Sequence, residues 1–278
     1  MRFGFHVSIE GNLHKCVQRA VDRGCEVFQI FFTGPVTWKQ RVFDKNEIDE
    51  FKRQLKISGS MNFYTHAPYL VNLCSPDKQI YRRSLDNMVF GVRQSIRIGA
   101  RALSFHIGSY RSMDYKWALK RLTGALNIIC RETSGELLIA LENSSGQGTS
   151  IGSSFNQIAE ILSMTNYSNL GICIDTCHAY AAGYDLASVQ GYGRFMNEIK
   201  EHIGFDRIFL IHLNDSKKPL SSGIDRHENI GSGYISLEGF RNIVNDENSK
   251  NIDAIMETPG RTLDSDLTNM KTIRSLVD

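Results

Sequence analysis

Side chains of the types that bind divalent metal ions recur along the chain at regular intervals. Six imidazole or carboxylate residues stand at the ends of successive apolar runs: His66, His106, Glu142, Asp175, His212 and Glu257. A single histidine at the end of a strand is more often a core or loop residue than a metal ligand. Six such residues at equivalent places would converge in one site, where buried charges without a counter-ion cost several kcal/mol each. The sequence therefore predicts divalent metal ions.

Three further candidates lie outside the strand ends. His178 follows Asp175 by three residues, and the stretch "GIDRHENIGSG" places Asp225 and His227 two positions apart. The total of five imidazoles and four carboxylates exceeds the needs of one ion, because a catalytic zinc takes about three protein ligands. Nine ligands with some bridging suit three ions. Four carboxylates with three divalent cations leave about +2 of formal charge, which favours a phosphodiester substrate.

The elements that must position these residues alternate between strands and helices. Eight short runs have strand character: "RFGFHV", "EVFQIFF", "NFYTHA", "ALSFHI", "ELLIALE", "GICIDT", "RIFLIHL" and "IDAIMET". Helical spacing of apolar residues covers 13–21, 48–55, 81–98, 115–129 and 155–162. Strand followed by helix, repeated, predicts parallel βαβ units. The first run also ends at a histidine, His6.

Eight units in 278 residues average roughly 35 residues each, which fits a (β/α)₈ barrel. We therefore predict one TIM-barrel domain over residues 1–278, with the metal site at the C-terminal mouth, where parallel strands of a barrel all end. Proline-rich and low-complexity linkers are missing from the sequence. A Rossmann fold is not favoured, because the last glycine of "GQGTSIG" comes one position late for the dinucleotide motif.

Composition fits a soluble intracellular protein. Hydrophobic residues make up 41% and charged residues 22% of the chain, and no stretch approaches the ~18 apolar residues of a membrane span. The first residues lack the apolar segment of a secretory signal, so we expect a cytoplasmic protein, nucleoid-associated if prokaryotic. The six cysteines are expected to be reduced. A net charge of +2 neither demands nor excludes nucleic acid.

Two cysteines lie close to the candidate ligands in "CIDTCH", but their chemistry is expected to be passive. Three residues separate Cys173 from Cys177, whereas haem attachment requires two. Strand alternation puts Cys173 on the same inward face as Asp175, one layer below the metal. Cys177 neighbours His178, and we expect it to pack behind the ligands rather than to bind metal or attack a substrate.

The sequence as a whole resembles the endonuclease IV family of apurinic/apyrimidinic (AP) endonucleases. The motifs that carry the resemblance are "HAPYLVNL", "FHIGS", "ALENSSGQG", "GICIDTCHAYAAGYD", "IHLNDSK" with "GIDRH", and "METPG". They occur in the same order over nearly the whole chain. The resemblance implies a (β/α)₈ barrel with three Zn²⁺ ions, with Mn²⁺ an alternative at part of the site.

The resemblance also implies a ligand set and a reaction. One ion would be held by His66, His106 and Glu142, a second by Glu142, Asp175, His212 and Glu257, and a third by His178, Asp225 and His227. The family cleaves DNA on the 5′ side of an abasic site through a metal-activated hydroxide, leaving a 3′-hydroxyl and a 5′-deoxyribose phosphate. Removal of 3′-blocking groups is a further implied activity. Glu142 and Glu257 are the catalytic candidates, with Glu257 able to orient or deprotonate the attacking water.

DNA contacts are implied for a smaller set of residues. Tyr69 and Leu70 match positions that the family inserts into the duplex, although they could instead pack within their own loop. Several relatives carry an arginine that enters the base stack where this chain has Val36. Lys39 or Arg41 could supply charge nearby without reproducing that stacking, so we expect weaker or more salt-sensitive DNA binding. The expected partner is double-stranded abasic DNA, bound by a monomer away from membranes.

Two other functions remain open at this stage. A sugar isomerase or epimerase of the same barrel superfamily would need only Glu142, Asp175, His212 and Glu257. It would leave the other five candidate ligands unexplained. A non-catalytic lesion-binding protein could keep the site for structural metal, but structural zinc sites usually close with cysteine-rich shells.

Overall fold

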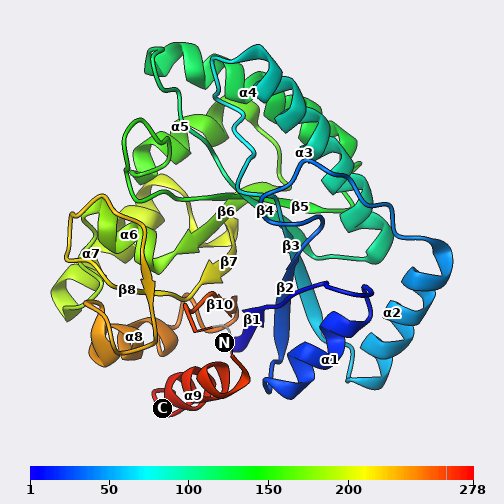
Figure 1. The fold of residues 1–278 in the computed structure, drawn as a ribbon. Helices are drawn as coiled ribbons and strands as arrows, with labels where there is room; N and C mark the ends of the chain where they lie inside the picture. The colour runs from blue at the N-terminus through cyan, green and yellow to red at the C-terminus, as the bar shows by residue number, and fades with distance from the viewer. Residues whose placement is uncertain (261) are drawn as a thin grey trace.

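The computed structural model describes residues 1–260 and 262–278, and its centre is a closed barrel of eight parallel strands (Figure 1). The barrel strands are β1 (Arg2–His6), β2 (Val27–Phe31), β3 (Asn62–His66), β4 (Ala102–His106), β5 (Leu138–Glu142), β6 (Leu170–Asp175), β7 (Ile208–His212) and β10 (Asp253–Met256). Each strand pairs with its neighbours in sequence order, and β10 closes the ring against β1. The predicted (β/α)₈ TIM barrel is confirmed.

Helices surround the barrel on its outer side (Figure 1). They are α1 (Lys15–Asp22), α2 (Lys45–Ile57), α3 (Lys78–Ile98), α4 (Tyr115–Glu132), α5 (Phe155–Thr165), α6 (Thr176–Ala182), α7 (Val189–His202), α8 (Ser236–Val244) and α9 (Leu263–Arg274), with a 3₁₀ turn η1 (Phe205–Arg207). All five predicted helices are present with shifted ends. For example, α3 begins three residues earlier than its apolar pattern, because Asp77 caps it by accepting from two backbone N–H groups.

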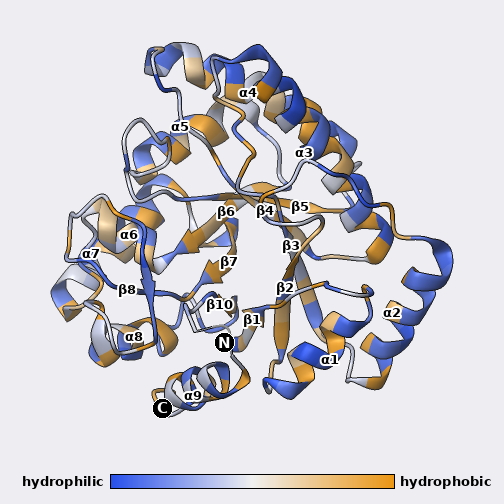
Figure 2. Ribbon diagram, viewed as in Figure 1, coloured by the Kyte–Doolittle hydropathy of each residue, from blue (hydrophilic) through white to orange (hydrophobic). Residues whose placement is uncertain are grey.

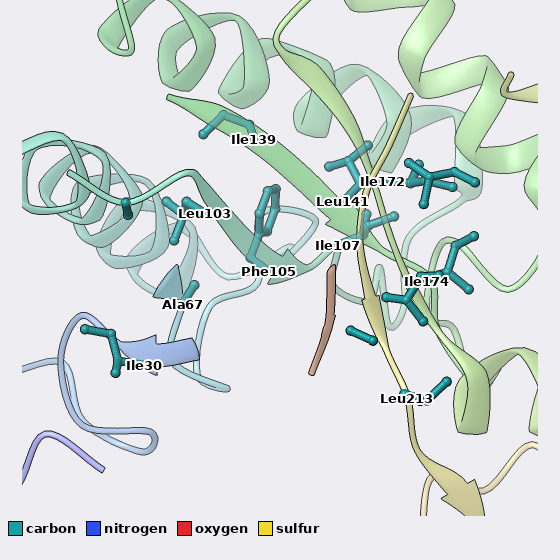
Figure 3. Packing of buried hydrophobic residues seen from close by; sticks show 14 of the residues in the cluster. Ile30, Ala67, Leu103, Phe105, Ile107, Ile139, Leu141, Ile172, Ile174 and Leu213 are labelled. Carbon is teal, nitrogen blue, oxygen red and sulfur yellow. The ribbon is translucent and has the colours of Figure 1, made fainter. Parts of the chain in front are cut away.

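Alternation along each strand separates two kinds of core. Residues of one parity point outward and join the large apolar cluster between strands and helices, as Leu103 and Phe105 do on β4 (Figure 3). Residues of the other parity point into the barrel, where Tyr64, Cys173 and Ile255 belong to a smaller apolar cluster. Figure 2 shows the consequence, with hydrophobic strands inside and mixed helices outside. The inward parity therefore decides which strand-end residues reach the mouth.

A polar group closes the opposite, N-terminal end of the barrel. Asp253 accepts a hydrogen bond from the hydroxyl of Tyr64 at 2.7 Å and forms an ion pair with Arg2, whose Nε lies 2.7 Å away. The Asp253 and Tyr64 side chains are almost fully buried. Burial, together with the charge of Asp253, raises the pKa of Tyr64, so the phenol stays protonated and donates. This end of a TIM barrel serves stability.

A small two-stranded sheet outside the barrel was not predicted. β8 (Asp215–Ser216) pairs antiparallel with β9 (His227–Glu228), so that Ser216 lies opposite His227. The six cysteines are free thiols. None of the helices within the described residues is long and apolar enough to cross a membrane.

Candidate metal centre

The predicted ligands at the strand ends gather at one mouth of the barrel. His66 ends β3, His106 ends β4, Glu142 ends β5, Asp175 ends β6 and His212 ends β7, while Glu257 immediately follows β10. All belong to the inward parity of their strands. The described residues contain four sets of possible metal ligands, and within each set the ligand atoms lie within 4.8 Å of one another. Glu142 belongs to two of these sets.

The first group consists of His66, His106 and Glu142. Nε2 of His66 lies 2.9 Å from Oε2 of Glu142, and Nε2 of His106 lies 3.3 Å from the same oxygen. Gly108, two residues after His106, has φ +111°, and a side chain there would meet Oδ1 of Asn72 at 2.4 Å. The glycine of "FHIGS" thus lets the loop after β4 turn closely above His106.

The second group lies deeper and contains Glu142, Asp175 and His212, with Glu257 beside it. Nδ1 of His212 lies 3.1 Å from Oε1 of Glu142, 3.9 Å from Asp175 Oδ2 and 3.8 Å from Glu257 Oε2. Asp175 and His212 are fully buried. Because Glu142 presents Oε2 to the first group and Oε1 to the second, its carboxylate can bridge two ions.

The third group consists of His178, Asp225 and His227, all from outside the barrel strands. Nε2 of His178 lies 3.1 Å from Oδ2 of Asp225, and Nε2 of His227 lies 3.3 Å from Oδ1. The β8–β9 hairpin carries His227 over the mouth. Asp215 fixes the following loop, because its buried carboxylate accepts hydrogen bonds from four backbone N–H groups: those of Ser216, Gly231, Gly233 and Ile235.

Local sequence explains why Asp175 and His178 enter the site together. Strand β6 ends at Asp175, which is also the N-cap of α6, and its Oδ1 accepts from the backbone N–H of His178 at 2.8 Å. His178 consequently lies on the first turn of α6, on the side that faces Asp175. Gly183, in the left-handed region at φ +114°, ends this short helix.

Hydrogen bonds fix which nitrogen each imidazole offers. Nδ1 of His66, His178 and His227 lies 2.6–3.0 Å from the backbone oxygens of Ala67, Asn143 and Glu257, respectively. These Nδ1 atoms must carry hydrogen, so Nε2 is left as the metal-binding atom, an arrangement usual for histidine ligands. Among the described residues, Nε2 of His227 is buried without a hydrogen bond of normal geometry.

The donor set fits divalent cations. Carboxylate oxygens and imidazole nitrogens are the ligands that zinc takes, and bonds of about 2.0–2.1 Å in a tetrahedron separate ligand atoms by about 3.3 Å. The closest ligand pairs in the three groups are 2.9–3.3 Å apart. The residues present could therefore hold three ions with little rearrangement.

The electrostatics of the ion-free groups also indicate a cation. Burial opposes protonation of His178, but the charges of Asp175 and Asp225 outweigh it and raise its pKa to about 10. The pKa of His227 rises to about 9, since the pull of Asp225 and Asp175 exceeds the effect of burial. Burial opposes ionisation of Glu257, yet His212 and His6 hold its pKa well below the usual range. Protons here occupy places that a divalent ion can take.

The two cysteines differ in their relation to these groups. Cys173 lies in the apolar layer inside the barrel, as expected, and burial raises its pKa to about 12. The Cys177 sulfur lies within 4.8 Å of ligand atoms of Asp175 and His227. Burial raises the pKa of Cys177 as well, and its Sγ donates to the backbone oxygen of Arg226 at 3.6 Å. The neutral thiol is a poor metal ligand.

Four polar residues that hold the ligands were given no role in the site from the sequence. Asn214 donates to Oδ2 of Asp175 at 2.7 Å and accepts from the backbone N–H of Glu257 at 2.7 Å. Asn143 makes two hydrogen bonds to the backbone of Asp175. His6 and Gln29 lie beside Glu257, where Nδ1 of His6 is 2.8 Å from Oε1 of Glu257. His6, which ends the first strand run, and Gln29 share the inward strand parity, but parity alone does not show which ligands they contact.

Two cavities flank the metal centre, and Tyr69 lines both. One, of about 490 Å³, includes Leu70 and Arg111 with the ligands His106, Glu142, His178 and Asp225. The other, of about 830 Å³, includes Val36 and Arg41 together with His6 and Glu257. The site is thus open on both sides of Tyr69, as a substrate that extends in two directions requires.

The predicted DNA-contacting residues lie around these cavities in different environments. Tyr69 is 46% exposed, and its ring lies 5.6 Å from that of His106. Leu70 is half-buried and Lys39 is exposed. Arg41 is ion-paired with Glu47 at 2.5 Å, so part of its charge is already neutralised within the protein. Val36 is 70% exposed at the rim of the larger cavity.

Comparison with known proteins agrees with this fold. A family model described as a xylose isomerase-like TIM barrel matches residues 17–276. A probable endonuclease 4 from Carboxydothermus hydrogenoformans is 37% identical over 100% of this chain and 98% of its own length. A probable endonuclease 4 from Nitrosopumilus maritimus is 36% identical over 99% of this chain and 98% of its length.

Solved structures extend the comparison. The crystal structure of endonuclease IV from Thermus thermophilus has a TM-score of 0.89 and 30% identity, covering 99% of this chain and 98% of that one. A D-tagatose 3-epimerase-like protein has a TM-score of 0.76 over 99% of this chain and 97% of its own, but its 17% identity shows a shared fold alone. Full-length identity above 30% and the endonuclease IV fold show that the chain belongs to the endonuclease IV family.

Proposed function

We propose that the protein is an AP endonuclease of DNA base excision repair. It would hydrolyse the phosphodiester 5′ to an abasic site in double-stranded DNA, leaving a 3′-hydroxyl and a 5′-deoxyribose phosphate, and would also remove 3′-blocking groups. The observation that carries the proposal is the position of Glu142, which bridges two of the three ligand groups at the mouth of a barrel of this family. We propose that it acts as a monomer.

The nine candidate ligands would hold three Zn²⁺ ions, with Mn²⁺ as an alternative in part of the site. His66 and His106 would share one ion with Glu142, while Asp175, His212 and Glu257 would share the second with it. The third would be held by His178, Asp225 and His227. Such ions lower the pKa of water toward ~7 and neutralise charge that develops on a phosphate.

Glu257 is the residue best arranged to orient a water molecule. Its Oε1 is held by Nδ1 of His6 and by Nε2 of Gln29, whereas Oε2 points toward His212 at 3.8 Å. With one oxygen fixed, the other can bind an ion or accept a proton in a constant orientation. The low pKa of this carboxyl keeps it ionised for either role.

DNA would bind across the mouth of the barrel, with Tyr69 at the lesion and one part of the duplex on either side of it. The exposed ring of Tyr69 and the neighbouring Leu70 suit insertion at a gap in the base stack, where a wedge offsets lost stacking. Lys39 and Arg41 would contribute charge at one rim, Arg41 less so because of Glu47. Backbone phosphates would be attracted mainly by the net charge of the occupied site.

One experiment tests the proposal directly. Metal content is measured on the purified full chain, and the same sample is assayed on a duplex with a single abasic analogue, with and without a chelator. We expect about three ions per chain, cleavage 5′ to the analogue, and loss of cleavage on chelation that Zn²⁺ restores. An undamaged duplex is the control. An intact abasic duplex in the presence of bound metal would overturn the proposal.

Two rival functions predict different results in the same experiment. A sugar epimerase would interconvert ketohexoses and leave the abasic duplex intact. However, it leaves His66, His106 and the third ligand group without a role. A lesion-binding protein without activity would retain abasic duplex in a filter assay without cutting it. The cavities on both sides of the centre argue for a reacting substrate instead.

A further inference from the structure

The side chain of Gln29 connects two candidate ligands that come from different strands. Gln29 lies in the middle of β2 and is fully buried. Its Nε2 lies 3.2 Å from Oε1 of Glu257, and its Oε1 lies 3.1 Å from Nε2 of His212. The hydroxyl of Ser104 donates to the same Oε1 at 3.1 Å. One amide therefore spans the inside of the barrel below the mouth.

The hydrogen-bond partners fix the orientation of this amide. An ionised Glu257 can only accept, so the Gln29 NH₂ group must face it and the amide oxygen must face the opposite way. The same reasoning makes Nδ1 of His6 a donor to Glu257 at 2.8 Å, which excludes it as an acceptor from Gln29 at 3.1 Å. An amide turned over would place its oxygen against the carboxylate.

This orientation determines the tautomer of His212. The oxygen of Gln29 accepts, so Nε2 of His212 must carry hydrogen, and Nδ1 is the only nitrogen of this ring that can bind a metal ion. Without an ion, Nδ1 donates to Oε1 of Glu142 at 3.1 Å, and a cation between the two atoms would take the place of that proton. His212 differs here from the histidines that bond backbone oxygens through Nδ1, because a side chain fixes its tautomer.

We propose that Gln29 is a positioning residue of the metal centre, which holds His212 in the Nδ1-binding tautomer and holds Glu257 by one oxygen. The inference rests on the proposed function, since it concerns the ion that Glu142, Asp175, His212 and Glu257 would share. Partners of this kind change metal affinity by about 10–100-fold when they are removed. The effect should be confined to that ion, because the side-chain hydrogen bonds of Gln29 within the described residues go to Glu257, His212 and the neighbouring Ser104.

The test compares Gln29→Leu with Gln94→Leu in the full chain. Gln94 on α3 is also buried and accepts from Phe43 N–H and from Arg97, away from the centre, so it controls for the loss of a buried amide. Zn²⁺ is titrated into each metal-free protein against a chromophoric chelator. We expect Gln29→Leu to bind one ion about 10–100-fold more weakly, while the other ions and Gln94→Leu match wild type.

A second readout separates positioning from general damage. Gln29→Leu should lower kcat on the abasic duplex at limiting Zn²⁺ and regain it at high Zn²⁺, with little change in KM. Unchanged affinity for every ion, or equal weakening of all ions with an equal effect of Gln94→Leu, would overturn the inference. If Gln29→Leu does not fold, Ser104→Ala and His6→Asn must each weaken the same ion by a smaller factor, or the inference fails. Wild type that binds no Zn²⁺ would instead overturn the proposed function itself.

Discussion

Oε1 of Glu142 lies 3.1 Å from Nδ1 of His212, although β5 and β7 are separated by β6 in the barrel. The other oxygen of the same carboxylate faces His66 at 2.9 Å. The layered interior of the barrel makes this possible, because inward-pointing residues of the alternate strands β3, β5 and β7 lie in one layer at the mouth. A single carboxylate thereby joins the surface-facing and deep parts of the centre.

Replacement of Glu142 should therefore remove more than one ion. We expect Glu142→Gln to lose about two ions per chain, because the amide keeps the size of the side chain but cannot bridge two cations. Loss of several kcal/mol of charge stabilisation corresponds to about 10²–10⁴-fold slower incision. Metal analysis and single-turnover incision measure both effects.

Glu160→Gln is the matched control, since Glu160 bonds the Tyr115 hydroxyl on the outer helices. Full metal content in Glu142→Gln would contradict the bridging role.

Replacement of Cys177 tests whether a sulfur close to the candidate ligands also binds metal. Its sulfur is close to Asp175 and His227, but the protonated thiol donates to the Arg226 carbonyl. A serine hydroxyl can donate in the same way, so Cys177→Ser should keep its metal content and most of its incision activity. The loss of one ion would identify Cys177 as a ligand.

The fold and the strand-end residues could be predicted because they repeat with a regular period. Each βα unit returns the chain to the same mouth of the barrel. The similar spacing along the sequence therefore predicts that the strand-end residues lie close together, as His66, His106, Glu142 and His212 do. Asp225 and His227 were found through their motif rather than their period. The hairpin that carries His227 has only two residues in each strand, too few for a pattern.

The residues that hold the ligands could not be predicted in the same way. Gln29 stands inside an apolar strand run, and its partners Ser104, His212 and Glu257 belong to β4, β7 and the end of β10. Hydrogen bonds across a barrel join strands that are far apart in sequence, so the spacing of residues along the chain cannot predict them. Asp215 is similar, since its four bonds to a later loop depend on the path of that loop.

Metal affinity should rise with pH. In the ion-free protein the pKa of His178 is about 10 and that of His227 about 9, so both hold a proton at pH 7 that a cation must displace. Affinity then increases by about tenfold per pH unit for each proton displaced, up to the range of these pKa values. Zn²⁺ titrations at pH 6.5, 7.5 and 8.5 check the slope, with His202→Gln on α7 as a control. Affinity that is independent of pH would contradict the assignment.

The buried hydrogen bond at the far end of the barrel should affect stability alone. Tyr64→Phe removes the hydroxyl that donates to Asp253 at 2.7 Å, and a lost bond to a buried charged acceptor costs about 1.5–3 kcal/mol. Urea unfolding of the metal-loaded protein should show this decrease in the free energy of unfolding. Zn²⁺ stoichiometry and incision should equal those of wild type. A change in either would show that the two ends of the barrel are coupled.

An arginine at position 36 should strengthen DNA binding. Val36 is 70% exposed at the rim of the cavity that contains Tyr69 and Glu257, so a longer side chain can extend toward bound DNA without disturbing the core. A guanidinium adds both charge and a flat stacking surface, and stacking on a base contributes about 1–3 kcal/mol. We expect Val36→Arg to bind an abasic duplex at least about fivefold more tightly, and Val36→Lys to gain less.

Val42→Arg is the control in this experiment, because it adds the same charge at a different place on the surface. Val42 is 65% exposed but lines neither of the two cavities described above, so an arginine there adds the same charge away from the mouth. Affinities are measured by fluorescence anisotropy with uncleavable duplex over a range of salt concentrations. Equal gains for Val36→Arg and Val42→Arg would mean that charge alone acts, and no gain for Val36→Arg would mean that the DNA does not pass over this rim. A gain confined to Val36→Arg would locate the path of the duplex beside Tyr69.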